Sequence, residues 1–172
     1  GLLTAIVEEA PELSFTTTAT MDFQMCFFGL ASDSWRYTGL SSLSKRRLGI
    51  VNGYGYGEPI DSYIDSNRGA ANLIELTGDA GLIRLVKMIE LGRLDTFIDD
   101  PNVVAWQQKK AYGVNVKISQ HGCLQAYPFY MALSPTLPGV ERLLNWLDQA
   151  LASKARQTHL QAVIKPKYLG EE

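Results

Sequence analysis

The chain has 172 residues, of which 46% are hydrophobic and 20% are charged, and this length suits one domain or two small lobes with an ordinary globular core. Its formal net charge of -2 excludes the basic footprint that is typical of nucleic-acid-binding proteins. The chain also lacks the run of about 20 apolar residues that a membrane-spanning helix needs. It opens without Met and without a visible signal peptide, which does not argue against export.

The first part of the chain is predicted to be mostly extended. Apolar or Thr-rich runs predict strands over residues 2–7, 14–20 and 21–30. A polar loop follows over residues 31–44, and Leu40 and Leu43 in it could form a short helical turn.

From residue 47 onward the predicted strands and helices alternate. Strands are expected at residues 47–52, 72–77, 95–98, 115–118 and 128–133, and helices at 58–66, 79–91, 102–110, 139–152 and 158–164. Alternation of this kind indicates βαβ units and a mainly parallel sheet covered by helices. In such sheets ligands bind at the carboxyl ends of the strands.

A glycine-rich loop follows the strand at residues 47–52 and opens a helix. Gly53, Gly55 and Gly57 alternate in it with Tyr54 and Tyr56. Glycines let the backbone approach a ligand closely, and the free N–H groups at a helix start favour an anion such as a carboxylate. A plain strand-to-helix turn is the competing interpretation, because the loop matches no complete phosphate-binding motif.

Two carboxylates, Asp99 and Asp100, end the strand at residues 95–98. They could hold a cation such as the ammonium of an amino acid. The competing interpretation is helix capping, because Asp100 precedes Pro101 at the expected start of a helix. The two roles are compatible.

The remaining chemistry-bearing residues give weaker signals. Aromatic residues near these loops, with Trp35 among them, could wall a small-molecule pocket. His121 is expected in a loop and His159 on a helix surface. Cys26 and Cys123 are interpreted as half-buried thiols, with a single disulfide as the alternative. No motif for a nucleophile, a metal site or an acid–base pair occurs.

Taken in order, several segments resemble the amino-acid-binding family of extracellular solute-binding proteins, which has the type II periplasmic-binding fold. Residues 35–43 (WRYTGLSSL) resemble the linker before the family's second lobe, and residues 45–54 (KRRLGIVNGY) resemble the strand and glycine loop after it. Residues 91–100 (LGRLDTFIDD) are similar to its most specific motif, a Gly-Arg-apolar-Asp turn leading into a strand that ends in Asp. Residues 130–135 (YMALSP) resemble the strand that returns to the first lobe, and the closing helices look like the family's C-terminal pair.

The resemblance implies an α/β fold with one complete βαβ-sheet lobe and a partial second lobe. Residues 1–23 would form the partial first lobe, residues 24–133 the complete ligand-binding lobe, and residues 134–172 the C-terminal helices that return to the first lobe. By this resemblance, the family's N-terminal unit, which carries an Arg that clamps the ligand carboxylate, would precede the segments seen here. The apolar flank exposed in this way predicts self-association, such as a homodimer, or a missing partner segment.

The resemblance also implies a set of ligand-binding residues. Asp100 stands where the family's Asp binds the ligand ammonium, with Asp99 beside it. Tyr54 stands where the family often has a Thr or Ser on the carboxylate, so that the contact could pass to Tyr56 or to the backbone N–H groups from Gly55 to Gly57. Closure would involve strands 23–28 and 129–133 as a hinge pair.

The function implied is binding of a small polar, amino-acid-like solute in an interlobe cleft for uptake by an ABC-type membrane permease, in the periplasm or outside the cell. No cofactor, metal or catalytic residue is expected. One alternative is a truncated, non-transporting sensor or protein-interaction module. The other is a dehydratase-like enzyme on the same fold, in which a cleft carboxylate acts as general acid or base.

Overall fold

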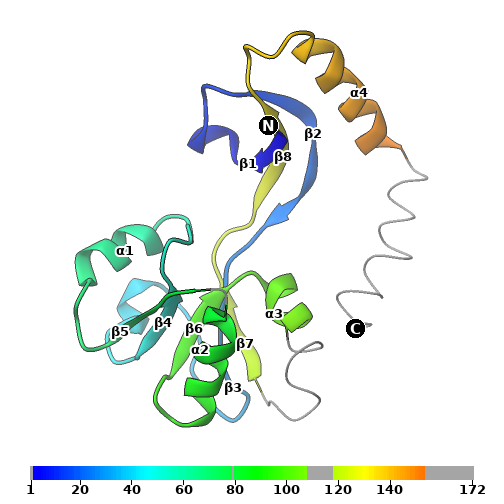
Figure 1. The fold of residues 1–172 in the computed structure, drawn as a ribbon. Coiled ribbons are helices and arrows are strands. Elements are labelled where there is room, and N and C mark those ends of the chain that lie inside the picture. The colour runs from blue at the N-terminus through cyan, green and yellow to red at the C-terminus, as the bar shows by residue number, and fades with distance from the viewer. Residues whose placement is uncertain (1, 79, 108–117, 154–172) are drawn as a thin grey trace. The chain divides into compact units, whose positions relative to one another are not determined.

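The computed structural model describes residues 2–78, 80–107 and 118–153 of the chain (Figure 1). The chain forms two compact units. Unit 1 comprises Gly1–Phe23 with Ala126–Glu172, and unit 2 comprises Gln24–Gln125. The chain therefore passes between the units twice, after Phe23 and after Gln125.

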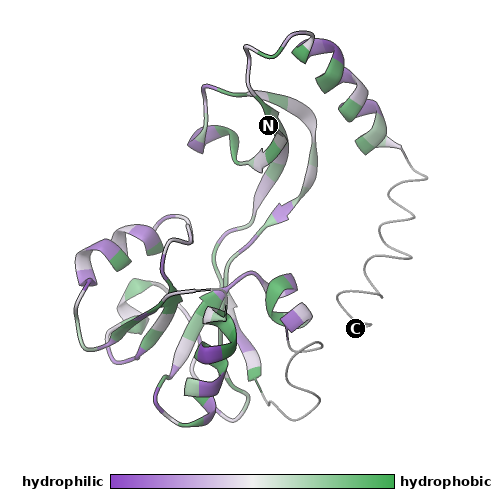
Figure 2. Ribbon diagram, viewed as in Figure 1, coloured by the Kyte–Doolittle hydropathy of each residue, from purple (hydrophilic) through white to green (hydrophobic). Residues whose placement is uncertain are grey.

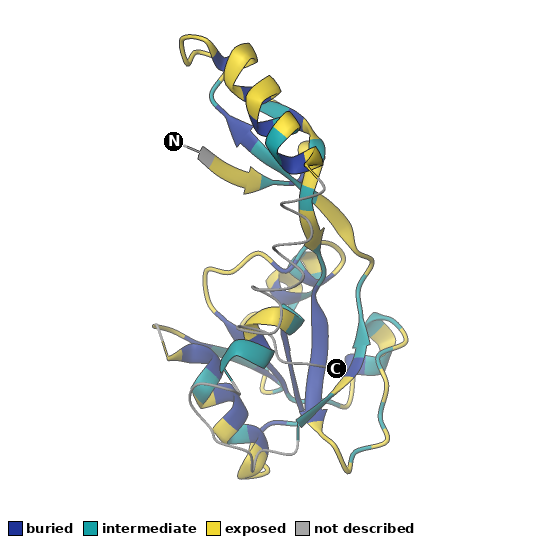
Figure 3. Cartoon of the chain, turned by 90° about the vertical axis from the view of Figure 1, so that its right-hand side faces the viewer, coloured by how far each residue is buried: buried dark blue, intermediate teal, exposed yellow. Residues whose placement is uncertain are grey.

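Unit 2 is built on a five-stranded mixed sheet with the order β5-β4-β6-β3-β7. The strands are β3 (Cys26–Leu30), β4 (Leu48–Val51), β5 (Leu73–Leu76), β6 (Thr96–Asp99) and β7 (Ile118–Cys123). β4 pairs in parallel with β5 and β6, whereas β3 is antiparallel to both of its neighbours. All four residues of β4 and of β6 are buried, as expected for central strands covered on both faces (Figure 3).

The helices of unit 2 follow the predicted alternation. They are α1 (Ile60–Asn67), α2 (Gly81–Glu90) and α3 (Pro101–Gln107), and a 3-10 turn at Leu40–Leu43 lies where a short helical turn was expected. α2 buries Leu82, Leu85, Val86 and Ile89 on one face. This helix packs directly on β4 because Gly49 has no side chain: a Cβ there would lie 2.5 Å from a methyl group of Leu85.

Strand β7 corrects two expectations. It extends to Cys123, so that His121, expected in a loop, is fully buried within a strand. Burial lowers the pKa of His121 and favours its neutral form. Cys26 and Cys123 are directly opposed in the β3–β7 ladder and form a disulfide, rather than two thiols. The sequence did not predict this pairing, because the two cysteines are 97 residues apart and only the sheet topology brings them together.

Unit 1 is a three-stranded antiparallel sheet with α4 (Val140–Ala152) packed against it. The strands are β1 (Leu2–Ala5), β2 (Ser14–Phe23) and β8 (Tyr127–Leu133), in the order β1-β8-β2, and a 3-10 turn at Val7–Glu9 follows β1. The apolar side of α4 packs on the sheet. Apolar and polar residues alternate along the helix (Figure 2). An irregularity in β2 leaves two backbone N–H groups outside the ladder, and the carboxylate of Asp148 on α4 accepts both, from Thr17 and Thr18.

The compact units divide the chain differently from the expected boundary at residue 133. β8 pairs with β1 and β2, so that it belongs to unit 1, and unit 2 ends at Gln125. The expected strand over residues 21–30 is likewise divided into the end of β2 and β3, where the chain leaves unit 1. The predicted helix over residues 158–164, with His159, and the first residues of the strand predicted at 115–118 lie outside the described residues.

Candidate functional site

The carboxyl edge of the unit 2 sheet collects the candidate residues. The parallel strands β4, β5 and β6 end there, at Val51, Leu76 and Asp99. The glycine-rich loop leaves the sheet from β4, and the acidic pair leaves it from the adjacent strand β6. Because the two strands are hydrogen-bonded neighbours, the loop and the acidic pair share one edge.

The two tyrosines of the loop have opposite environments. Tyr54 is 56% exposed, and Tyr56 is 1% exposed. The Tyr56 hydroxyl accepts the Val51 N–H at 2.7 Å and donates to the Val51 carbonyl at 3.1 Å, and burial raises its pKa. Tyr56 thus ties the loop to the end of β4, while Tyr54 presents its ring to solvent.

A carboxylate that the sequence analysis did not single out holds the other end of the loop. Asp61, in the first turn of α1, accepts the backbone N–H of Tyr56 on one oxygen and that of Gly57 on the other, each at 2.9 Å. These are N–H groups that were expected to be free for a ligand. An Asp at the start of the predicted helix was the available sequence signal, because acidic side chains accept free N–H groups at helix starts.

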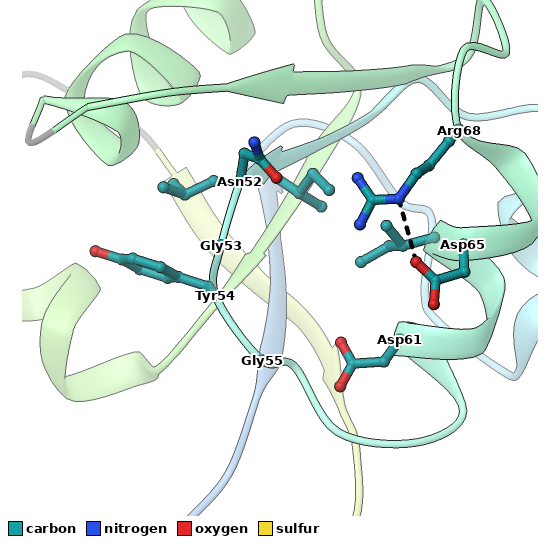
Figure 4. Close-up of a pocket in the computed structure, with 10 residues that line it drawn as sticks. Asn52, Gly53, Tyr54, Gly55, Asp61, Asp65 and Arg68 are labelled. Carbon is teal, nitrogen blue, oxygen red and sulfur yellow. Dashed lines mark hydrogen bonds and ion pairs between the residues drawn. The ribbon is translucent and has the colours of Figure 1, made fainter.

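A pocket of about 250 Å³ lies between this loop and α1 (Figure 4). It is lined by Ile50, Val51, Asn52, Gly53, Tyr54, Gly55, Asp61, Ile64, Asp65 and Arg68. Asp61, Asp65 and Arg68 project from the helix side, whereas the Tyr54 ring is directed away from them (Figure 4). The Arg68 guanidinium is bonded to Asp65 at 3.1 Å and to Glu75 at 2.6 Å, so that its charge is already compensated.

Asp99 and Asp100 have different surroundings. Asp99 is 3% exposed; its Oδ1 accepts the Asp100 N–H at 2.8 Å, and its Oδ2 has no hydrogen-bond partner. Burial, together with the charge of Asp100, raises the Asp99 pKa to about 6. The charge of Asp99 also helps to raise the pKa of Tyr56, so that the acidic pair and the loop are electrostatically coupled. Asp100 is half-buried and caps α3, accepting the N–H groups of Asn102 and Val103 at 2.7 and 3.2 Å.

Trp35 packs against Phe27 of β3, with the ring centroids 6.0 Å apart. Its indole N–H donates to the Ser42 carbonyl, and the guanidinium of Arg46 lies 5.1 Å from its ring centroid. Arg46 comes just before β4 begins, while the glycine-rich loop comes just after β4 ends. The structure therefore places Tyr54, Gly55, Tyr56, Gly57, Asp99 and Asp100 at one edge of the sheet. It packs Trp35 against Phe27, His121 and Arg46 instead.

Within residues 2–78, 80–107 and 118–153, no group of three or more His, Cys, Asp or Glu side chains is placed to hold a metal ion. In the same part of the chain, no helix is both long enough and apolar enough to cross a membrane.

Comparison with known proteins identifies the fold through structure alone. No protein-family model matches the sequence, and the search of curated proteins finds no match. A probable amino-acid ABC transporter extracellular-binding protein from Bacillus subtilis is similar in structure, with a TM-score of 0.68 and 17% identity over 98% of this chain and 69% of that one. The arginine-, lysine-, histidine-binding protein ArtJ from Geobacillus stearothermophilus has a TM-score of 0.63 and 14% identity over 99% of this chain and 68% of that one. A mutant of ArgBP from T. maritima has a TM-score of 0.63 and 15% identity over 98% and 67%.

These likenesses cover nearly the whole of this chain but about two thirds of each similar structure. At identities of 14–17% they show the fold, and the expected α/β class is confirmed. The chain has the type II periplasmic-binding fold of the amino-acid-binding proteins, over about two thirds of their length.

Proposed function

We propose that this chain binds a small solute carrying an ammonium group at the carboxyl edge of the unit 2 sheet. The observation that carries the proposal is the acidic pair at the end of β6. Asp99 has a buried oxygen acceptor without a donor, and Asp100 beside it is accessible. The two adjacent carboxylates concentrate negative charge at this edge, so that a ligand that brings a positive charge to the accessible Asp100 would be favoured.

The glycine-rich loop supports this location. Tyr56 and Asp61 hold the loop at both ends, so that Tyr54 and Gly55 lie exposed on a fixed segment beside the acidic pair. A binding surface held in place before the ligand arrives loses little conformational entropy on binding. Similar structures named as amino-acid-binding proteins add support from the fold.

The wider role is also part of the proposal. The chain passes between the units twice, and closure of two units over a ligand would use these passages as the hinge. The closed form would then be recognised by the membrane permease of an ABC transporter. The disulfide between Cys26 and Cys123 favours a periplasmic or extracellular location, because disulfides persist in oxidising compartments.

Thermal unfolding of the purified chain tests the proposal. The probes are the common L-amino acids, polyamines and small carboxylates without an amine. A ligand present at 100 times its dissociation constant stabilises the folded state by about 2.7 kcal/mol, or several degrees. We expect a shift with amine-bearing probes and none with simple carboxylates; the absence of a shift with every probe would count against solute binding.

Self-association through unit 1 is a second candidate. On α4, Trp146 is 61% exposed and Leu143 is 37% exposed, on the side away from the helix face that packs on the sheet. Apolar side chains grouped in this way are typical of surfaces that contact another protein. A second copy of this chain is the partner proposed, and the native mass tests it.

A further inference from the structure

We propose that Asp61 makes the binding edge selective for amines that carry no carboxylate. This inference rests on the proposed function and names its ligand class. Binding of a whole amino acid needs a place for the carboxylate, and the glycine-rich loop at the start of α1 is the place that the backbone geometry offers. In this chain a side chain of the protein, Asp61, already accepts two N–H groups of that loop, those of Tyr56 and Gly57.

Each carboxylate oxygen of Asp61 accepts one backbone N–H of the loop. Oδ1 of Asp61 lies 2.9 Å from the Tyr56 nitrogen, and Oδ2 lies 2.9 Å from the Gly57 nitrogen. The two oxygens thus take one backbone donor each, in the manner of a bound carboxylate. A ligand carboxylate would have to displace Asp61 or lie beside its charge, and like charges that share a site repel each other strongly.

The cation that lines the same pocket offers no compensation. Nε of Arg68 contacts Asp65, and Nη1 contacts Glu75. A ligand carboxylate would therefore compete with two existing ion pairs. Among the described residues that line this pocket, Arg68 is the only cation.

The charged groups at this edge that can still accept hydrogen bonds include the carboxylates of Asp61 and Asp99. Asp61 has lone pairs beyond the two N–H bonds that it accepts, because each carboxylate oxygen can accept two hydrogen bonds. Asp99 has an oxygen with no donor, and it is 3% exposed. Both features favour a ligand that brings donors and positive charge. A primary amine or a guanidine without an acid group fits this edge, and agmatine is the test compound because it is arginine without its carboxylate.

The test is titration calorimetry of the whole chain with agmatine and with L-arginine, followed by cadaverine and L-lysine as a second matched pair. We expect each decarboxylated amine to bind at least tenfold more tightly than its amino acid. Equal or tighter binding of the amino acids would overturn this inference and leave solute binding intact. The absence of heat with all four would overturn both proposals.

Two variants assign the selectivity to Asp61. Asp61→Ala frees both N–H groups and removes the charge, and we expect it to reduce the agmatine preference at least tenfold. Glu58→Gln removes one charge just before the same helix without touching these N–H groups, since Glu58 is exposed and bonds only Ser62 among the described residues. We expect it to keep the preference within twofold. An equal loss in both variants would mean that the general negative charge, and not Asp61, sets the selectivity. Circular dichroism checks that Asp61→Ala is folded, and the wild-type comparison holds without any variant.

Discussion

Asp100 donates its backbone N–H to the carboxylate of Asp99, at 2.8 Å, so that two adjacent acids at the end of β6 are linked and yet differ in surroundings. Asp99 faces the interior, and Asp100 caps the following helix and stays accessible. Because of this difference, substitutions at each position should affect folding and ligand binding to different extents.

For Asp100, two substitutions divide its roles. Asp100→Asn keeps a side-chain oxygen for the cap but removes the charge, whereas Asp100→Ala removes both. Because Asn caps helices as well as Asp, we expect Asn to leave stability within about 0.5 kcal/mol and Ala to cost about 1 kcal/mol. Both variants should weaken binding of an amine at least tenfold, measured by calorimetry. Binding by the Asn variant within twofold of the wild type would remove Asp100 from the site.

For Asp99, the raised pKa predicts a pH dependence of stability. The folded-state pKa is about 6, against an ordinary value of 3.8, so that the folded protein binds more protons than the unfolded chain between these pH values. Because of Asp99, the free energy of unfolding of the wild type should therefore fall as the pH rises from about 4 to 6. Asp99→Asn should flatten that dependence and raise the free energy of unfolding at pH 7 by about 1–3 kcal/mol. Urea unfolding at pH 4.5, 6 and 7 measures this, and a less stable Asn variant at pH 7 would refute it.

The disulfide should contribute strongly to the stability of unit 2. Cys26 and Cys123 close a loop of 97 residues, and a bridge of this span destabilises the unfolded chain by about 4.7 kcal/mol through lost chain entropy. A Cys26→Ala, Cys123→Ala variant should unfold at a lower urea concentration, and a reductant should shift the wild type toward it. The reductant should leave the double variant unchanged. An identical midpoint of the wild type with and without reductant would contradict the prediction.

The buried hydroxyl of Tyr56 should matter for stability. Tyr56→Phe leaves the buried Val51 N–H without its acceptor, which costs about 1–3 kcal/mol. Tyr54→Phe is the matched control, because the Tyr54 ring is 56% exposed. Thermal unfolding compares the two. A Tyr56→Phe variant as stable as the control would show that water replaces the lost bond.

The exposed face of α4 tests self-association. If a second copy covers Trp146, sedimentation of the wild type should show a mass that rises with concentration, and Trp146→Glu should keep the chain monomeric. Lys87→Glu, on the last turn of α2 in unit 2, is the control for the charge change and should leave the mass unchanged. A monomeric wild type at all concentrations would exclude this partner.

The sequence by itself determined the order and type of most described elements. Their signals are local: the apolar periodicity along α2 and α4, the short apolar runs of the strands, and a glycine after the end of α2. That glycine, Gly92, has a positive φ of 65° in the structure. The carboxyl edge with its loop and acidic pair also followed from the alternation of strands and helices, because parallel strands end at one edge. The capping role of Asp100 was readable from the Pro that follows it.

Only the tertiary structure decided the relationships that span long stretches of chain. It paired Cys26 with Cys123, buried His121 in β7 and joined β8 to the strands of unit 1, because strand pairing depends on topology and not on neighbouring residues. It also separated residues that the sequence treated alike: Tyr56 is buried and Tyr54 exposed, and Trp35 packs with Phe27 and Arg46 and not with the loop. Above all it directed Asp61 onto the loop N–H groups, and a bond of this kind depends on the distance between donor and acceptor, which composition and spacing do not specify.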